Sequence, residues 1–493
     1  MRKPLCLALL AAWSLSAPAN DAVQRGEATL TLRPCQISGP ARLQTIAAEC
    51  GQLTVPEDYS QPDGRRIELY VARIRAISQR AAPDPVVVIA GGPGMASTDF
   101  YASVAPAFAR LRRERDVLIM DQRGTGRSNR LDCQFDDDDL IDPDSVDIAA
   151  ITRTCRDDLS QRAALTQYTT SVAVRDLETL RLALGYAQLN LYGVSYGTRV
   201  AQHYARRYAD ATRTLILDGV VPPTLVLGPE MALDAEAALQ RILARCQNDP
   251  ECHDALGNPL VDYRALWAAL GEQRVKVTLA DPRTGVQREL EFGQPHLSAV
   301  LRLASYDPSQ SALLPMALKQ AQRDRDFRAL AAQYLMISRS LDSTVAYGMH
   351  NSVACSEDAP LIDLATLPRD ALAATHMGLK QVEQLVAMCR EWPRGIVDSD
   401  LHAPLSSTVP ALLMSGGDDP VTPPKYATEA QRAFADNAHL ILPGFGHGQL
   451  MAPCVDTIMA QFVAAGTAAK LNTSCTAKLK PMPFFLSPAG PAP

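Results

Sequence analysis

Long runs of basic residues and long apolar segments are almost absent from this sequence. The formal net charge is only −6 over 493 residues, so the chain lacks the electrostatic surface that attracts nucleic acid or anionic lipid. Beyond the amino terminus, no segment has the length and apolar purity of a membrane-spanning helix. These absences argue against nucleic-acid binding and against a stable membrane span, and they favour a small neutral or cationic substrate.

Cysteine spacing typical of a metal site is also missing. No cysteine pair has the tight spacing or the partner histidines of a zinc site, and we expect neither a metal nor another cofactor. The chain has eleven cysteines, of which Cys6 lies in a segment that we expect to be removed. The other ten fall into neighbouring pairs: Cys35 with Cys50, Cys133 with Cys155, Cys246 with Cys252, Cys355 with Cys389, and Cys454 with Cys475. This even set predicts disulfides and an oxidising compartment, with ten reduced, buried cysteines as the alternative.

The first 19 residues have the three parts of a signal peptide. Arg2 and Lys3 give a charged start, residues 5–15 form an apolar stretch too short to span a bilayer, and Ala17-Pro18-Ala19 offers small residues at a cleavage site. The sequence therefore predicts export to the periplasm or the extracellular medium. An uncleaved anchor or a buried helix is the alternative interpretation.

Short β-branched runs alternate with segments of helical spacing through much of the chain. The runs are typical of buried parallel strands, and they occupy residues 85–90, 116–120, 188–192, 214–217, 411–414 and 440–442, after a half-exposed alternating strand at 67–74. Helical spacing occupies residues 174–184 and 198–208. This alternation predicts an α/β fold with a mostly parallel central sheet flanked by helices on both faces.

The pattern changes between residues 222 and 405, where the sequence is mostly helical and rich in Ala and Leu. One hairpin interrupts it, with strands at 275–280 and 286–292. We predict a signal peptide (1–19), a first part of the core (20–221), a helical cap with a β-hairpin (222–405), and a second part of the core with a C-terminal tail (406–493). The acidic run 136–139 is expected to be a solvated loop.

Gly193-Val194-Ser195-Tyr196-Gly197 lies directly between a predicted strand and a predicted helix. A G-x-S-x-G sequence in that position forms a sharp turn that exposes the serine hydroxyl above the sheet, as a nucleophile requires. A serine that only caps its helix is the alternative. Since a serine hydroxyl is a poor nucleophile until a base removes its proton, a histidine must lie within hydrogen-bonding reach.

His447 is the candidate base. It stands in Pro443-Gly444-Phe445-Gly446-His447-Gly448, a glycine-flanked loop after the last predicted strand. His439 lies in that strand and His203 in a helix, and both are expected to be ordinary packing or surface residues.

Asp419 is the favoured acid, because it follows the strand just upstream of the histidine strand. Its role would be to accept a hydrogen bond from the N–H of the far imidazole nitrogen and to stabilise the imidazolium. Asp418 is a rival shifted by one residue. Asp218, at the end of an earlier strand, is a second rival that could equally accept backbone N–H groups in a turn.

Ala90-Gly91-Gly92-Pro93-Gly94 follows a predicted strand where an oxyanion hole would need backbone donors. The N–H of Gly92, or alternatively of Gly91, together with that of Tyr196, would stabilise the developing oxyanion. One such donor contributes about 3 kcal/mol in the transition state. A plain tight turn is the alternative.

With these residues assembled, the chain resembles the tripeptidyl aminopeptidase branch of the proline-iminopeptidase-like α/β-hydrolases. The matching stretches are CGQLTVPEDY at Cys50, GGPG at Gly91, DQRGTGRS at Asp121, LYGVSYGT at Leu191, DPVTPP at Asp419 and GFGHG at Gly444. The resemblance implies an α/β-hydrolase fold, release of short peptides from a free amino end through an acyl-enzyme on Ser195, and Asp419 as the acid. Ala90 and Tyr196 replace the His and Trp usual in proline iminopeptidases, which puts proline specificity in doubt.

An exopeptidase of this kind needs a carboxylate that pairs with the substrate ammonium. Glu357 or Asp358 is the candidate, because a disulfide at Cys355 would hold this segment still; two carboxylates near a helix start are the alternative. Asp121 and Arg123 are expected to brace loops rather than to touch substrate.

Two other functions remain open. The first is a carboxylesterase or lipase that uses the same three residues on an ester. The second is a secreted binding protein that keeps the fold without the reaction.

Overall fold

The central feature of the molecule is a nine-stranded sheet. The computed structural model describes residues 30–39, 45–135, 141–487 and 489–490, so the predicted signal peptide, Cys6 and the acidic run 136–139 lie outside the described residues. The strand order is β1-β2-β3-β5-β4-β6-β7-β10-β11. The strands are β1 (Arg33–Ser38), β2 (Thr45–Pro56), β3 (Arg66–Ile74), β4 (Val86–Ile89), β5 (Val117–Met120), β6 (Leu189–Val194), β7 (Thr212–Asp218), β10 (Ala411–Gly416) and β11 (Asn437–Leu442).

The strands from β5 to β11 in this order all run parallel. In the register, Val194 at the end of β6 faces Asp218 at the end of β7, and Asp218 faces Met414 of β10. Parallel strands bring their carboxyl ends to one edge of the sheet, so the segments that follow β4, β6, β7, β10 and β11 meet there. The predicted α/β fold with a mostly parallel sheet is confirmed.

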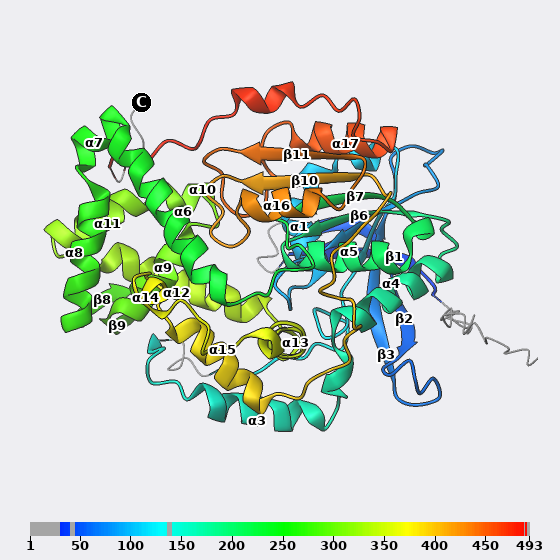
Figure 1. Ribbon diagram of the computed structural model, residues 1–493, viewed down its shortest axis with the longest axis horizontal. Helices are drawn as coiled ribbons and strands as arrows, with labels where there is room; N and C mark the ends of the chain where they lie inside the picture. The colour runs from blue at the N-terminus through cyan, green and yellow to red at the C-terminus, as the bar shows by residue number, and fades with distance from the viewer. Residues whose placement is uncertain (1–29, 40–44, 136–140, 488, 491–493) are drawn as a thin grey trace, which may run out of the picture.

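Helices cover both faces of the sheet (Figure 1). One face packs against α4 (Thr170–Ala183), α5 (Tyr196–Arg207) and α16 (Pro424–Gln431), and the other against α1 (Ser97–Val104) and α17 (Val455–Ala465). Side chains alternate between the two apolar cores along each strand: Val87 and Ile89 of β4 lie in the first, Val86 and Val88 in the second. Burial on both faces explains why these strands read as continuous β-branched runs.

The sequence predicted no strand before residue 67, so β1 and β2 were missed. The two strands pair antiparallel with each other, and β2 pairs antiparallel with β3. Most residues of β2 are only partly buried or exposed, because the strands form the end of the sheet. A strand with a half-exposed surface lacks the apolar run that marks a central strand.

Between β7 and β10 the chain forms mostly helices, which lie beside and below the sheet in Figure 1. A separate apolar core joins many of them to the predicted hairpin. The elements are α6 (Pro229–Asn248), α7 (Pro250–Leu256), α8 (Pro259–Glu272), β8 (Val275–Ala280), β9 (Gln287–Phe292), α9 (Gln294–Ala304), α10 (Pro308–Ser311), α11 (Leu314–Arg323), α12 (Arg328–Thr344), α13 (Tyr347–Val353), the π-helical turn η5 (Ala354–Asp358), α14 (Arg369–Ala373) and α15 (Lys380–Glu391). From here on, these helices are called the helical region. The helix α3 (Ile148–Ser160), from earlier in the sequence, packs beside α15.

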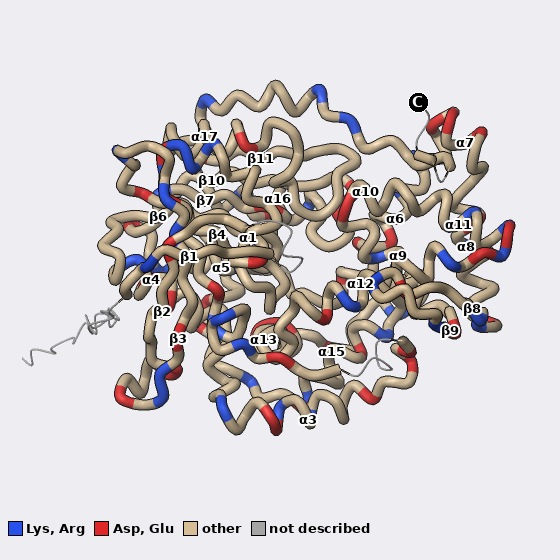
Figure 2. The backbone as a smooth tube through the Cα atoms, turned by 180° about the vertical axis from the view of Figure 1, so that it is seen from behind, with Lys and Arg blue, Asp and Glu red and all other residues tan. Residues whose placement is uncertain are grey.

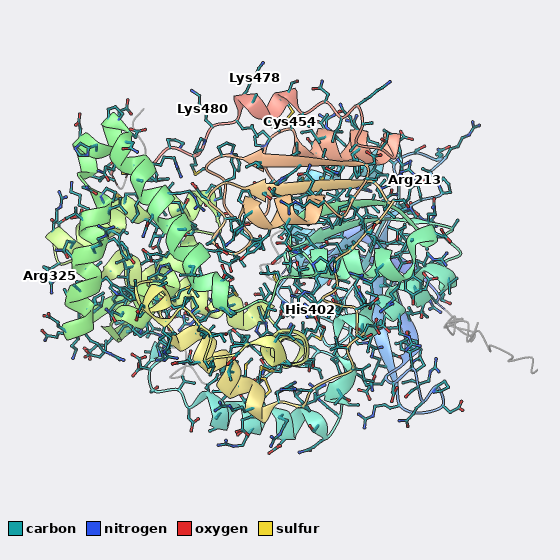
Figure 3. The ribbon with its side chains drawn as sticks, in the orientation of Figure 1. Arg213, Arg325, His402, Cys454, Lys478 and Lys480 are labelled. Atoms are coloured by element: carbon teal, nitrogen blue, oxygen red, sulfur yellow. A yellow bond between two sulfur atoms is a disulfide. The ribbon has the colours of Figure 1, made fainter. Side chains whose placement is uncertain are left out.

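His402 ties the two ends of the helical region together, and Figure 3 shows it at the junction with the sheet. Its Nδ1 lies 2.9 Å from Pro223 O, and its Nε2 lies 2.8 Å from Glu357 O. Both partners are carbonyl oxygens, which only accept hydrogen bonds.

The C-terminal tail crosses from α17 to the helical region (Figure 1). Phe484 is buried in a small apolar cluster with α6 and α7, and the Arg245 guanidinium lies 4.4 Å from the centre of the Phe484 ring. A Cβ at Gly444 would come within 2.2 Å of Pro481, so the tail also packs against the loop that precedes His447. The tail thus contacts both parts of the molecule.

The ten cysteines of the described residues form five disulfides with the predicted pairing, Cys35–Cys50, Cys133–Cys155, Cys246–Cys252, Cys355–Cys389 and Cys454–Cys475. No helix in the described part of the chain has the length and apolar character to cross a membrane. Figure 2 shows Lys and Arg residues interspersed with Asp and Glu around the whole chain, as the small net charge suggests.

Candidate active site

Ser195 occupies a strained turn between β6 and α5. Its backbone has φ 55° and ψ −126°. Residues other than glycine rarely adopt this conformation, so the surrounding structure must enforce it. Glycines on both sides make the turn possible: a Cβ at Gly193 would lie 2.4 Å from Gly197 O, and one at Gly197 would lie 2.5 Å from Ile89 O. The predicted nucleophile turn is therefore present at the carboxyl end of β6.

His447 lies in the loop after β11 and contacts Asp419. The distance from His447 Nδ1 to Asp419 Oδ2 is 2.8 Å. This bond places the proton on Nδ1 and leaves the Nε2 lone pair available as a base. The backbone N–H of His447 donates to Tyr306 O at 2.8 Å, which fixes the loop from the helical region.

Asp419 is fully buried and accepts hydrogen bonds on both oxygens. Oδ1 accepts from the N–H groups of Val421 and Thr422, each at 2.8 Å, and Oδ2 accepts from Thr422 Oγ1 at 2.8 Å. Burial alone would raise the pKa of the Asp419 carboxyl, but His447 and these donors outweigh it and lower the pKa. Burial has the opposite effect on a base, so by itself it would lower the pKa of the His447 imidazole. The negative charge of Asp419 outweighs burial, and the pKa of His447 is raised.

The two rival acids have other partners. Asp418 faces the helical region, with Arg241 and Arg245 of α6 each 3.6 Å away. Asp218 accepts from the Tyr192 hydroxyl at 2.8 Å and from the N–H groups of Gln449 and Leu450 at 2.8 Å and 3.1 Å. Asp218 therefore holds the segment just after His447 rather than the imidazole.

Ser195 and His447 meet at the end of β7. The Ser195 N–H donates to Asp218 O at 2.8 Å, and a Cβ at the next residue, Gly219, would lie 3.0 Å from His447 Cε1. In the part of the chain that the structure describes, no hydrogen bond joins Ser195 Oγ to His447. Such bonds often form only when substrate is bound.

The loop after β4 runs against the nucleophile. A Cβ at Gly91 would lie 2.9 Å from Ser195 Cβ, and Gly92 has φ 108°, a region that favours glycine. The N–H of Tyr196 is the first of α5 and has no acceptor within its own helix. The Tyr196 hydroxyl is held by Thr170 Oγ1 at 2.7 Å and Gln122 Nε2 at 3.0 Å.

Asp121 and Arg123 brace the surrounding loops, each with its own partner. Asp121 accepts from the N–H and hydroxyl of Thr98, the second residue of α1, at 2.9 Å and 2.8 Å. Arg123 forms a fully buried two-bond pair with Asp176 at 2.6 Å and 2.7 Å. Both contacts are of the kind that scaffolds use.

Glu357 and Asp358 lie in η5 and are buried against Arg199 of α5. Asp358 makes two bonds of 2.9 Å with the Arg199 guanidinium. Glu357 accepts from the N–H of Thr170 at 2.7 Å and lies 3.4 Å from Arg199. Burial raises the pKa of Glu357 to about 7. Arg199, which no sequence motif marked as important, thus connects the nucleophile helix to the helical region.

Sequence reasoning missed Thr422, Tyr306 and His350 at the site. Thr422 belongs to the DPVTPP stretch, and its hydroxyl lies 3.1 Å from His447 Nδ1. The Tyr306 ring packs edge-on against the His447 ring at 5.1 Å, and His350 Nδ1 lies 3.3 Å from Pro93 O. The last two come from the helical region and carry no local signal in the sequence.

Comparison with known proteins agrees with this geometry. The family described as "alpha/beta hydrolase fold" matches residues 84–452. The chain is 24% identical to the serine protease Hip1 of Mycobacterium tuberculosis over 483 residues, with 90% of each chain covered. It is 24% identical to a tripeptidyl aminopeptidase of Streptomyces lividans, covering 88% of this chain and 85% of that one. It is 26% identical to carboxylesterase B of M. tuberculosis, covering 87% and 86%.

The resemblance that the motifs indicated is confirmed by these relatives, which align with nearly the whole chain. The family match covers most of the residues between β4 and the histidine loop. The chain therefore belongs to the α/β hydrolase fold family and is a serine hydrolase.

Proposed function

We propose that this protein is an exported serine exopeptidase that releases short peptides from the free amino end of its substrates. The observation that supports the proposal most directly is the 2.8 Å contact between His447 Nδ1 and buried Asp419, at the sheet edge that also carries the strained Ser195 turn. Relatives named serine protease and tripeptidyl aminopeptidase align over nearly the full length.

In the first step, His447 Nε2 takes the proton of Ser195 Oγ as the oxygen attacks the scissile carbonyl carbon. Asp419 stabilises the imidazolium that forms and keeps its own negative charge. The N–H groups of Gly92 and Tyr196 receive the negative oxygen of the tetrahedral intermediate. His447 then gives its proton to the departing amine, which leaves an ester between the released peptide and Ser195.

In the second step, water replaces the amine. His447 takes a proton from the water, the resulting hydroxide attacks the ester carbonyl, and the same N–H groups stabilise the second intermediate. Collapse returns the proton to Ser195 Oγ and frees a peptide with a new carboxylate. The same residues thus serve both steps.

Glu357 is the proposed source of the negative charge that meets the substrate ammonium. Asp358 is already neutralised by its two bonds to Arg199, whereas Glu357 shares that arginine at the longer distance of 3.4 Å. A buried carboxylate with a raised pKa gains most from a new cation, because the cation offsets the cost of burial.

The proposed export rests on the five disulfides together with the predicted signal peptide. Disulfides persist in oxidising compartments and are rare in the cytosol. Detection of the mature chain in the periplasm or the medium, with an amino terminus near residue 20, tests this part.

The test of exopeptidase activity compares a tripeptide arylamide with its N-acetylated form. We expect the protein to cleave the free-amino substrate and not the acetylated one. Glu357→Gln should raise KM for the free-amino substrate and spare a blocked ester, while Glu383→Gln, which changes an exposed glutamate of α15 paired with Arg369, serves as the control. Equal effects of Glu357→Gln on both substrates would discard its role.

Carboxylesterase activity is the second candidate, because carboxylesterase B aligns over 87% of this chain. An ester requires the same nucleophile, base and oxyanion donors but no charge for an ammonium. Equal cleavage of acetylated and free-amino esters, with no cleavage of any peptide amide, would favour the esterase.

A further inference from the structure

Tyr306 brings the helical region into contact with the proposed base. It lies two residues after the end of α9, its ring packs edge-on against the His447 ring at 5.1 Å, and its carbonyl accepts the His447 N–H at 2.8 Å. A Cβ at Gly446 would lie only 2.3 Å from Tyr306 O. The chain just after α9 therefore lies directly over the histidine loop.

Arg302 precedes Tyr306 by four residues and lies in the last turn of α9. Residues four apart share one face of a helical turn. The Arg302 guanidinium lies next to the Tyr306 phenol, where its charge opposes the rise in the phenol pKa that burial causes. The Asp419 charge raises the pKa of the same phenol, and the Tyr306 ring packs against His447, so Arg302 lies close to the catalytic residues.

A second neighbour places Arg302 near the oxyanion loop as well. Burial lowers the pKa of the His350 imidazole; Pro93 O and Asp358 oppose this shift, and the Arg302 charge adds to it. His350 in turn contacts Pro93 O at 3.3 Å. Arg302 therefore lies within electrostatic reach of both the histidine loop and the loop after β4.

Arg302 also lacks a carboxylate partner. It is half-buried, and no carboxylate of the described residues lies within ion-pair distance of it. Most half-buried arginines elsewhere in the described part of the chain have such a partner, as Arg181 has Glu178 and Arg339 has Asp281. An unpaired guanidinium beside an active site is suited to a carboxylate that arrives with the substrate.

We propose that Arg302 is a specificity-determining residue that binds a carboxylate on the leaving part of the substrate. His447 delivers its proton to the departing amine, so groups that contact His447 from the helical region face the leaving side. The inference rests on the proposed exopeptidase activity and names the substrates that activity favours: short peptides whose scissile bond lies close to a free α-carboxylate or to an acidic side chain.

The test uses four substrates with the same three amino-terminal residues. One is a tetrapeptide with a free carboxylate, and the second is the same peptide with a C-terminal amide. The third and fourth are amidated tetrapeptides that end in Asp or Asn, so that the acidic side chain is separated from the α-carboxylate. We expect the wild-type protein to favour at least one carboxylate over its uncharged counterpart by about tenfold in kcat/KM.

Arg302→Gln should abolish that preference, Arg302→Lys should keep part of it, and Arg283→Gln, at an exposed turn of the hairpin, should leave it unchanged. A tripeptide arylamide carries no carboxylate on its leaving group, so Arg302→Gln should lose much less kcat/KM on it than on the carboxylate peptides, and the remaining cleavage shows that the variant folds. The inference is overturned if the wild-type protein prefers neither the free carboxylate over the amide nor Asp over Asn, or if Arg302→Gln keeps the preference that the wild-type protein shows. Failure of the wild-type protein to cleave the arylamide would instead overturn the proposed exopeptidase activity.

Discussion

Two fully buried aspartates lie at adjacent strand ends, Asp218 as the last residue of β7 and Asp419 in the loop after β10, and their pKa values shift in opposite directions. Burial raises the pKa of Asp218 to about 6, because its partners are a phenol and two backbone N–H groups. Asp419 is equally buried, yet its pKa falls below the ordinary value because the imidazole of His447 faces it at 2.8 Å.

The difference lies in what each carboxylate touches. Asp218 holds the backbone just after His447, and Asp419 holds the imidazole itself. Since both aspartates lie at the same edge of the sheet, position along the fold does not assign the role; the contact with the His447 imidazole does. The comparison predicts that Asp419 contributes chiefly to catalysis and Asp218 chiefly to stability.

The largest effect is expected for Asp419→Asn. The amide would favour the wrong imidazole tautomer and remove the charge that stabilises the imidazolium, so kcat should fall by about 10⁴-fold. Steady-state kinetics on an arylamide or ester measures this. A loss below tenfold would mean that another group orients His447.

Asp218→Asn should lower the stability of the protein more than its kcat, the opposite of Asp419→Asn. An asparagine retains one acceptor oxygen for three donors, and each buried N–H left without a partner costs about 1 to 3 kcal/mol. Urea unfolding should show this loss of stability, while kcat falls far less than in Asp419→Asn. Tyr192→Phe removes one of the same donors and should leave a milder defect. A rate loss equal to that of Asp419→Asn would erase the distinction between the two aspartates.

The pH dependence of kcat/KM should report the charge of Asp419. His447 must be neutral to act as a base, and its raised pKa means that activity rises with pH through a midpoint above about 6.5, the ordinary value for histidine. In the residual activity of Asp419→Asn, this midpoint should move to lower pH, because burial of the imidazole is then opposed by the Asp218 charge alone. An unmoved midpoint would assign the titration to another group.

Asp418→Asn is expected to have the smallest effect. Its contacts with Arg241 and Arg245 are 3.6 Å long, and both arginines are partly exposed, so the free energy of unfolding should change by less than about 1 kcal/mol. The kcat should stay near the wild-type value. A large loss would make Asp418 the acid and contradict the geometry.

The central strands could be predicted from the sequence because burial on both faces leaves an unbroken β-branched run. Residues 86–89 and 117–120 are buried without exception. The strands β1 and β2 could not, since their partly exposed residues follow no consistent apolar pattern. Whether such a segment pairs depends on its neighbour in the sheet, which is β2 for β1 and β3 for β2.

The site was predictable where its residues stand in loops at strand ends. Ser195 and Asp419 follow apolar runs, and glycines surround His447. The contacts of Arg199, Tyr306 and Arg302 depend instead on how the helical region folds onto the sheet. Long-range packing of that kind leaves no mark at the residues themselves, so sequence patterns alone do not find them.

The most direct test of the account is covalent labelling of Ser195. The protein is treated with a fluorophosphonate, digested and analysed by mass spectrometry, with Ser195→Ala as the control. We predict one adduct, on the peptide that carries Ser195, together with loss of hydrolase activity in proportion to labelling. An active protein that stays unlabelled at Ser195, or one whose Ser195→Ala variant keeps its activity, would contradict the assignment of Ser195 as the nucleophile.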